Sequence, residues 1–154
     1  MAHVIDRDMG WKKIKAELAR ARRLEVAVGI LAGSAGADGA SIAEYATYNE
    51  FGTKHIPERP FMGISFDENV GQIGNDFDQQ GAALVQGQRT ATQALTVIGM
   101  KHAARVQNTI TSRDIPPPLA PSTVAAKKNN STKTLVDTGA MVNAVQISVR
   151  PRST

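Results

Sequence analysis

The stretch from Asp67 to about Ser112 constrains the fold most, because its apolar residues recur at helical spacing over a long part of the chain. Gly81 and Gly87 weaken a helix, and we expect a break near Gly87. The stretch therefore predicts two long helices joined by a turn. The first should carry acidic residues opposite an apolar side made of Val70, Ile73, Phe77 and Leu84. The second should carry a stripe made of Leu95, Ile98, His102, Val106 and Ile110.

In two short segments every second residue is apolar, which is typical of strands with one buried face. The first runs from Leu24 to Leu31 and the second closes the chain, ending at Pro151. Their apolar positions are Val26, Val28 and Ile30 in the first, and Val145, Ile147 and Val149 in the second. We expect the two strands to pair with each other. At 154 residues the chain fits a single domain, spanning residues 1–154.

Charge is distributed unevenly along the chain. Residues 1–23 hold seven Lys or Arg residues against three acidic ones, and residues 64–88 hold four acidic residues and no basic one. Asp8 is placed to cap a basic N-terminal helix from about Met9 to Arg22, with Trp11, Ile14, Leu18 and Ala21 on one face. A solvated helix surface accounts for the basic residues, and contact with nucleic acid is the alternative.

Glycine and proline mark the connections. Residues 32–40 are rich in Gly and Ala and predict a flexible loop, which lacks the lysine and hydroxyl of a phosphate-binding loop. Residues 113–122 include Pro116, Pro117 and Pro118 and predict a stiff, extended connector. Ser122 or Thr123 is then expected to cap a short helix over 124–128. A single helical turn should follow Gly139, immediately before the last strand.

The segment from Tyr45 to Phe61 is the densest run of special residues and is predicted to be the structural hub. Ser41 and Glu44 form a capping box that opens a helix, and Gly52 ends it. The hub residues are Tyr45, Phe51, Gly52, Pro57, Pro60 and Phe61. Among them Tyr45, Phe51 and Phe61 are expected to anchor the core, which Ile64 and Phe66 should also contact, while the two prolines hold an extended segment.

The charged residues of this segment are candidates for contacts between subunits, and Glu50 and Glu58 are also explained as partners of the nearby Arg59 or Lys54. The candidates are Glu50, Lys54, Glu58 and Arg59. A buried pair between Arg59 and a carboxylate is the contact we expect most, because a guanidinium binds a carboxylate through two parallel hydrogen bonds.

The residue inventory argues against catalysis. The chain has no cysteine, and His3, His55 and His102 show no metal-ligand spacing. No nucleophile stands in a catalytic context, and no carboxylate pair lies near a histidine. The sequence therefore predicts a protein with no catalytic site, no metal site and no cofactor. No apolar run is long enough to span a bilayer and the N-terminus is not a secretory signal, so no membrane partner is expected.

Three blocks of sequence resemble the tail-completion, or head–tail joining, proteins of long-tailed bacteriophages, a family of minor tail or neck components. The most specific block is N-E-F-G-T at 49–53 followed by P-E-R-P-F at 57–61. The others are P-L-A-P-S-T-V at 118–124 and L-V-D-T-G at 135–139 with Met141. The chain departs from the family where Met62, Gly63 and Ile64 follow the first block, since a basic residue and a proline are common there.

The resemblance implies an α+β fold in which a small antiparallel β-sheet packs against long α-helices. It also implies a structural protein of the virion neck, present in the host cytoplasm during assembly. Such a protein forms a homo-oligomeric ring, expected to be a hexamer. The ring would lie between a portal or head-completion protein and a tail terminator or tail tube protein, and DNA would pass through it without specific binding.

One hypothesis concerns the channel of that ring. The acidic residues Asp67, Glu68, Asp76 and Asp78 would line it and repel DNA, with a plain solvated helix face as the alternative. Two other functions stay open: an assembly factor that is not retained in the neck, and a basic DNA-binding protein.

Overall fold

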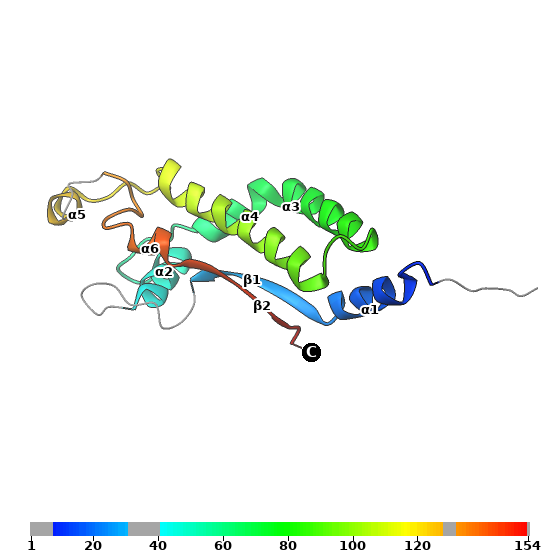
Figure 1. The fold of residues 1–154 in the computed structure, drawn as a ribbon. Coiled ribbons are helices and arrows are strands. Elements are labelled where there is room, and N and C mark those ends of the chain that lie inside the picture. The colour runs from blue at the N-terminus through cyan, green and yellow to red at the C-terminus, as the bar shows by residue number, and fades with distance from the viewer. Residues whose placement is uncertain (1–7, 31–40, 128–131, 154) are drawn as a thin grey trace, which may run out of the picture.

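The computed structural model describes residues 8–30, 41–127 and 132–153 (Figure 1). The elements in these residues are α1 (Trp11–Ala21), β1 (Leu24–Ile30), α2 (Ile42–Phe51), α3 (Phe61–Val85), α4 (Ala91–Ser112), α5 (Pro121–Ala126), α6 (Ala140–Asn143) and β2 (Val145–Pro151). They form an α+β fold with a small antiparallel sheet, as predicted. The loop expected at 32–40 lies outside the described residues, as do residues 1–7 of the basic N-terminal segment.

The two strands pair along their whole length, which confirms the pairing expected from their alternation. Val26 lies opposite Val149, and Val28 lies opposite Ile147. At one end of the ladder the Arg150 Nε donates a hydrogen bond of 2.8 Å to the Glu25 carboxylate across the strands. Because side chains alternate along a strand, the valine and isoleucine positions share one face of the sheet.

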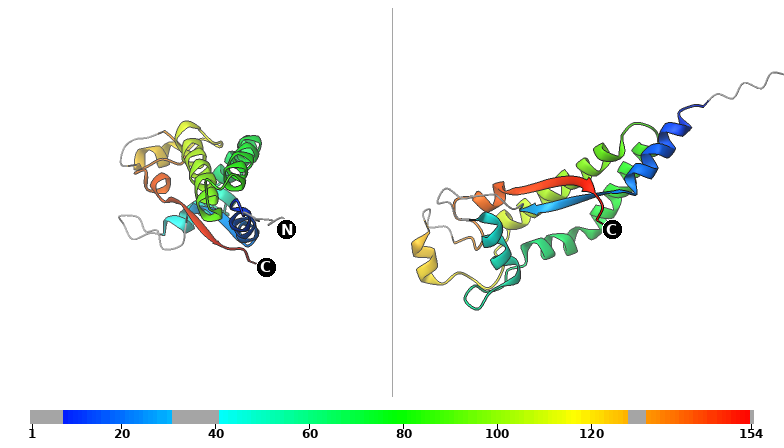
Figure 2. Two further views of the ribbon diagram at one scale, coloured as in Figure 1. Left: turned by 45° about the vertical axis from the view of Figure 1, so that its right-hand side comes forward. Right: turned by 90° about the horizontal axis from the view of Figure 1, so that it is seen from below.

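The molecule is layered, with α4 between the sheet and α3 (Figures 1 and 2). The close approach of α4 to the sheet depends on Gly99. A Cβ added there would lie 2.6 Å from a Val26 methyl carbon and 3.3 Å from an Ile147 methyl carbon. Buried positions therefore occur around much of α4. α3 packs on α4 with one side only, and the other side of α3 is exposed.

The break between the two long helices occurs at Gly87, as the sequence predicted. Gly87 has a φ of +72°, and α4 then opens with a capping box between Thr90 and Gln93. The start of the first helix was predicted wrongly, because α3 begins at Phe61 rather than Asp67. Its first amides are capped by a side chain from α2, a long-range contact that local sequence patterns do not reveal.

The core lies at the end of the sheet where α2, α4 and α6 meet. It is mostly aliphatic, and its buried members are Ala46, Phe61, Ala103, Val106, Ile110, Ile115, Leu135, Met141 and Val145. Phe61 is 1% exposed, so its predicted role as a core anchor is confirmed. Phe66 is 48% exposed and is not a core residue, contrary to expectation.

The two ends of the elongated molecule carry different helices. α1 projects past the α3–α4 turn at one end, and α5 lies at the other (Figures 1 and 2). Asp8 accepts a hydrogen bond from the Lys12 amide, although α1 begins only at Trp11. α5 begins at Pro121 with Ala120 as its N-cap, so the expected cap at Ser122 or Thr123 was wrong. No helix in the described ranges is long and apolar enough to cross a membrane.

Candidate assembly surface

α2 starts and ends at the residues that the sequence indicated, but only the Ser41 half of the predicted capping box is present. The Ser41 hydroxyl accepts a hydrogen bond of 3.3 Å from the Glu44 amide. The Glu44 carboxylate in turn accepts a hydrogen bond from the Tyr48 hydroxyl, which raises the pKa of Tyr48. At the other end Gly52 has a φ of +71°, and a Cβ there would lie 3.1 Å from the Glu58 amide nitrogen. Both constraints favour glycine at position 52.

Glu50 joins α2 to α3. Its carboxylate oxygens accept hydrogen bonds of 2.9 Å from the Met62 amide and 3.0 Å from the Gly63 amide. These amides belong to the first turn of α3, where a helix has unpaired donors and a partial positive charge. Glu50 therefore stabilises contact between two helices of one chain. The contact between subunits that we expected of it is not needed to explain its presence.

Arg59 joins the same segment to the proline-rich connector. Its side chain is buried, at 5% exposure, and donates hydrogen bonds of 3.2 Å from Nε and 2.9 Å from Nη2 to the Pro117 carbonyl. Within the chain, Arg59 therefore binds a backbone carbonyl rather than the carboxylate that we expected. Prolines lack amide hydrogens, so the connector can be held through its carbonyl groups, and a guanidinium can reach one carbonyl with two donors.

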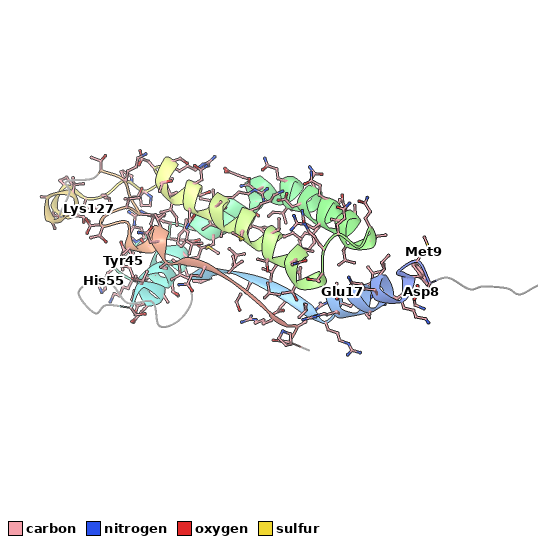
Figure 3. The ribbon with its side chains drawn as sticks, viewed as in Figure 1. Asp8, Met9, Glu17, Tyr45, His55 and Lys127 are labelled. Carbon is pink, nitrogen blue, oxygen red and sulfur yellow. The ribbon has the colours of Figure 1, made fainter. Side chains whose placement is uncertain are left out.

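The aromatic residues of α2 face outward. Tyr45 is 47% exposed, Tyr48 38% and Phe51 75%, so Tyr45 and Phe51 are not the core anchors that we expected (Figure 3 labels Tyr45). The inner face of α2 is made of Ala46 and Asn49, both buried. These smaller residues let α2 lie close to the core. Phe51 is on the opposite side of the helix, whereas Tyr45 lies one turn before Asn49 and is about half exposed. We call Tyr45, Tyr48 and Phe51 the α2 aromatic face.

The remaining hub and contact residues follow α2 in the irregular segment before α3. Pro57 is exposed, and Pro60 is half-buried as the N-cap of α3. Lys54 and Glu58 are both exposed in the segment that follows α2. Of the four charged candidates, Glu50 and Arg59 are therefore engaged within the chain, whereas Lys54 and Glu58 are accessible to another molecule.

The acidic residues of α3 do not share one solvated face. Asp76 is 5% exposed and pairs with Lys101 and Arg105 of α4, each at 2.6 Å. The hydrogen bond from Lys101, together with Arg105, lowers the pKa of Asp76 although burial opposes this. Phe77 and Val70 are instead exposed, so the predicted orientation of α3 was wrong at these positions.

The proposed channel lining loses two of its four carboxylates. Asp76 is buried, and Glu68 pairs with Arg113 at 2.6 Å on the surface. Asp67 and Asp78 remain exposed without an ion pair to any residue that the structure describes. Two separated carboxylates are a weak basis for a wall that repels DNA. A cue for the Asp76 pair existed in the sequence, since Lys101 and Arg105 are one turn apart on the neighbouring helix.

The described residues offer little for small-molecule chemistry. No group of three or more His, Cys, Asp or Glu side chains among them could hold a metal ion. His102 has a pKa lowered by burial and by Arg105, and its ring meets Phe66 edge-on with centroids 6.3 Å apart. A pocket of about 130 Å³ lies between α1 and the α3–α4 turn. Ligand sites are usually larger, at roughly 300–1,000 Å³.

The exposed surface of α2 is the candidate functional site that the described residues support. Exposed aromatic side chains are enriched where proteins bind one another, because they bury a large area with few rotatable bonds. Comparison with protein-family models, curated proteins and solved structures finds no match to this chain. The functional argument therefore depends on the α2 aromatic face, the charged residues that follow α2 and the motifs of the same segment.

Proposed function

We propose that this protein is a structural component of the neck of a long-tailed bacteriophage. It forms a homo-oligomeric ring, a hexamer, that joins the head connector to the tail and lets DNA pass. The proposal rests on one observation: the segment with the N-E-F-G-T and P-E-R-P-F motifs holds α2 in place while its aromatic residues face outward. Its partners are a portal or head-completion protein on one side and a tail terminator or tail tube protein on the other.

The fixed position of α2 supports a binding role. Glu50 attaches α2 to the start of α3, and Arg59 attaches the following segment to the connector. A surface held in its bound conformation loses less conformational entropy when a partner binds. Lys54 and Glu58 are exposed in the segment that follows α2, and charged residues near an interface influence which partner binds and how fast.

Mass spectrometry of purified particles from the phage that encodes this chain tests the proposal. A connector must be present in complete particles at a few copies each. An assembly factor that leaves before completion would be abundant in infected cells and missing from the particles. Detection in infected cells alone would therefore replace the connector with the assembly factor.

A second candidate function, DNA binding, is favoured by α1. Its basic residues Lys12, Lys13, Lys15 and Arg20 are all exposed. Affinity for duplex DNA would then fall steeply with salt, because each neutralised phosphate releases counterions. A binding measurement at low and moderate salt decides the matter, and the absence of binding at low salt would dismiss this function.

A further inference from the structure

α3 has an apolar stripe that the described part of the chain leaves about half exposed. Phe66, Val70 and Phe77 are 48%, 55% and 47% exposed, and their spacings of four and seven residues place them on one face of the helix. Gly74 and Gly81 lie along the same side, where an added Cβ would meet no atom within 4 Å. Small residues next to an apolar stripe allow a second helix to approach closely. We call Phe66, Val70 and Phe77 the α3 stripe.

The stripe is bordered by negative charge. Asp67 and Asp78 are exposed near its two ends, and α3 contains no Lys or Arg. The two aspartates are eleven positions apart, which corresponds to about 16 Å along the helix axis. A complementary partner is therefore a helix of about that length with an apolar side and a basic residue near each end.

α1 of the same protein has these properties. It is an 11-residue helix without a buried residue, and Trp11 and Leu18 are 61% and 39% exposed. These two residues are seven apart, which matches the spacing of Val70 and Phe77 on α3. Lys12 lies near the start of α1 and Arg20 near its end. Either direction of packing would bring a basic residue to each aspartate.

α1 is already attached elsewhere in its own chain. The Glu17 carboxylate accepts a hydrogen bond of 2.7 Å from the Ala91 amide at the start of α4, and Ile14 lines the pocket between α1 and the α3–α4 turn. The rest of the helix projects past the end of the molecule (Figures 2 and 3). While α1 keeps this attachment, its free apolar side is available to another molecule.

We propose that α1 of one copy of this chain packs on the α3 stripe of the next copy. Trp11 and Leu18 cover the stripe, and the basic residues at the two ends of α1 pair with Asp67 and Asp78. The contact joins two different patches of the same protein, and repeated contacts of this kind close into a ring when the rotation between copies permits. The inference rests on the proposed ring and identifies one of its subunit contacts.

Engineered disulfides test this contact directly, because the chain has no cysteine of its own. Trp11→Cys protein is mixed with Val70→Cys protein, and in a second mixture with Phe77→Cys protein, under mild oxidation. At least one mixture should give a covalent dimer. The matched control is Gln72→Cys, an exposed position on another side of α3, which should not cross-link to Trp11→Cys. The absence of a dimer in both test mixtures would overturn the proposal.

Charge reversal provides a second, independent test by native mass spectrometry. The Asp67→Lys, Asp78→Lys double variant should weaken self-association at least tenfold, because like charges then face each other. Adding Lys12→Glu and Arg20→Glu should restore it. The control variant, Gln72→Lys with Gln79→Lys, adds positive charge to α3 away from the stripe and should leave association unchanged.

The outcomes separate the contact from the ring. If the wild-type protein forms rings and the charge reversal leaves them intact, the contact is wrong and the proposed connector function stands. If the wild-type protein stays monomeric at every concentration and no cross-link forms, the contact is also wrong. If the wild-type protein is monomeric and is also missing from phage particles, the connector function fails as well.

Discussion

The guanidinium of Arg59 donates two hydrogen bonds to one acceptor, the carbonyl oxygen of Pro117, at 3.2 and 2.9 Å. This contact joins residues 58 positions apart in the chain. It attaches the segment after α2 to the connector between α4 and α5. The Arg59 amide also donates a hydrogen bond of 2.6 Å to the Asn49 carbonyl on α2. Arg59 therefore holds three parts of the fold together.

Replacing Arg59 should destabilise the single chain. Arg59→Ala removes two hydrogen bonds made by a buried charged group, and we expect a loss of about 1.5–3 kcal/mol in the free energy of unfolding. Arg59→Lys should also lose stability, since an ammonium cannot reproduce the paired geometry. Urea denaturation of the monomer measures both. Arg152→Ala, at an exposed position, is the control, and an equal effect there would contradict the assigned role.

The structure revises what Arg59→Ala was expected to do. The subunit contact expected for Arg59 implies that Arg59→Ala would weaken a ring more than the monomer. The partner of Arg59 is instead Pro117 of the same chain. The monomer should therefore respond first, and any weakening of the ring should follow from the lost stability.

The stability of the chain should depend on pH through Asp76. Its folded-state pKa lies below the ordinary value of 3.8, so its stabilising contribution is present above pH 3.8 and is lost as the pH falls through the lower folded value. At neutral pH, Asp76→Asn should lower the free energy of unfolding by about 1–3 kcal/mol. The difference from wild type should shrink below about pH 4.

Denaturation at several pH values, with Asp78→Asn as the control, checks this prediction. Asp78 is exposed and has no ion pair among the described residues, so its replacement should change the curve little. A constant difference between Asp76→Asn and wild type down to pH 2 would show that the ionised carboxylate does not supply the stabilisation.

Two glycine substitutions should have opposite effects. Gly99→Ala places a Cβ 2.6 Å from a Val26 methyl carbon and should cost about 1–3 kcal/mol, because α4 must move away from the sheet. Gly71→Ala meets nothing within 4 Å in the middle of α3 and should stabilise by about 0.5–1 kcal/mol. Thermal unfolding of the two variants measures both changes. Equal tolerance of both would contradict the close packing of α4 on β1.

Removing the α2 aromatic face should abolish joining without unfolding the protein. The Tyr45→Ser, Phe51→Ser variant changes two exposed side chains and should keep its circular dichroism and stability within about 0.5 kcal/mol. In a phage complementation assay it should yield few infectious particles. Val85→Ser, at an exposed apolar position at the end of α3, is the control and should complement normally.

Several elements could be predicted because their signals are local. The alternation around Val28 and Ile147 indicates strands with one buried face, and the φ values of Gly52 and Gly87 fit the helix ends expected from glycine. The predicted stripe on α4 is buried at Ile98, Val106 and Ile110, whereas Leu95 and His102 are half-buried. Each of these signals depends on neighbouring residues, so a single sequence contains it.

The errors have a common physical cause, which is that the deciding partner lies far away in sequence. Phe51 has the character of a core residue, but the inner face of α2 is occupied by Asn49, which is 2% exposed. Asp76 is buried against Lys101 and Arg105 of α4. These partners are 25 and 29 residues away, so the local pattern around Asp76 does not reveal them. α3 starts six residues earlier than expected because Glu50 caps it from α2.

Electron microscopy of particles from a phage that lacks this protein tests the proposed connector function most directly. Without the connector, filled heads and complete tails should accumulate separately, and supplying the wild-type protein should restore joined particles. Joined and infectious particles in the absence of the protein would contradict the connector function.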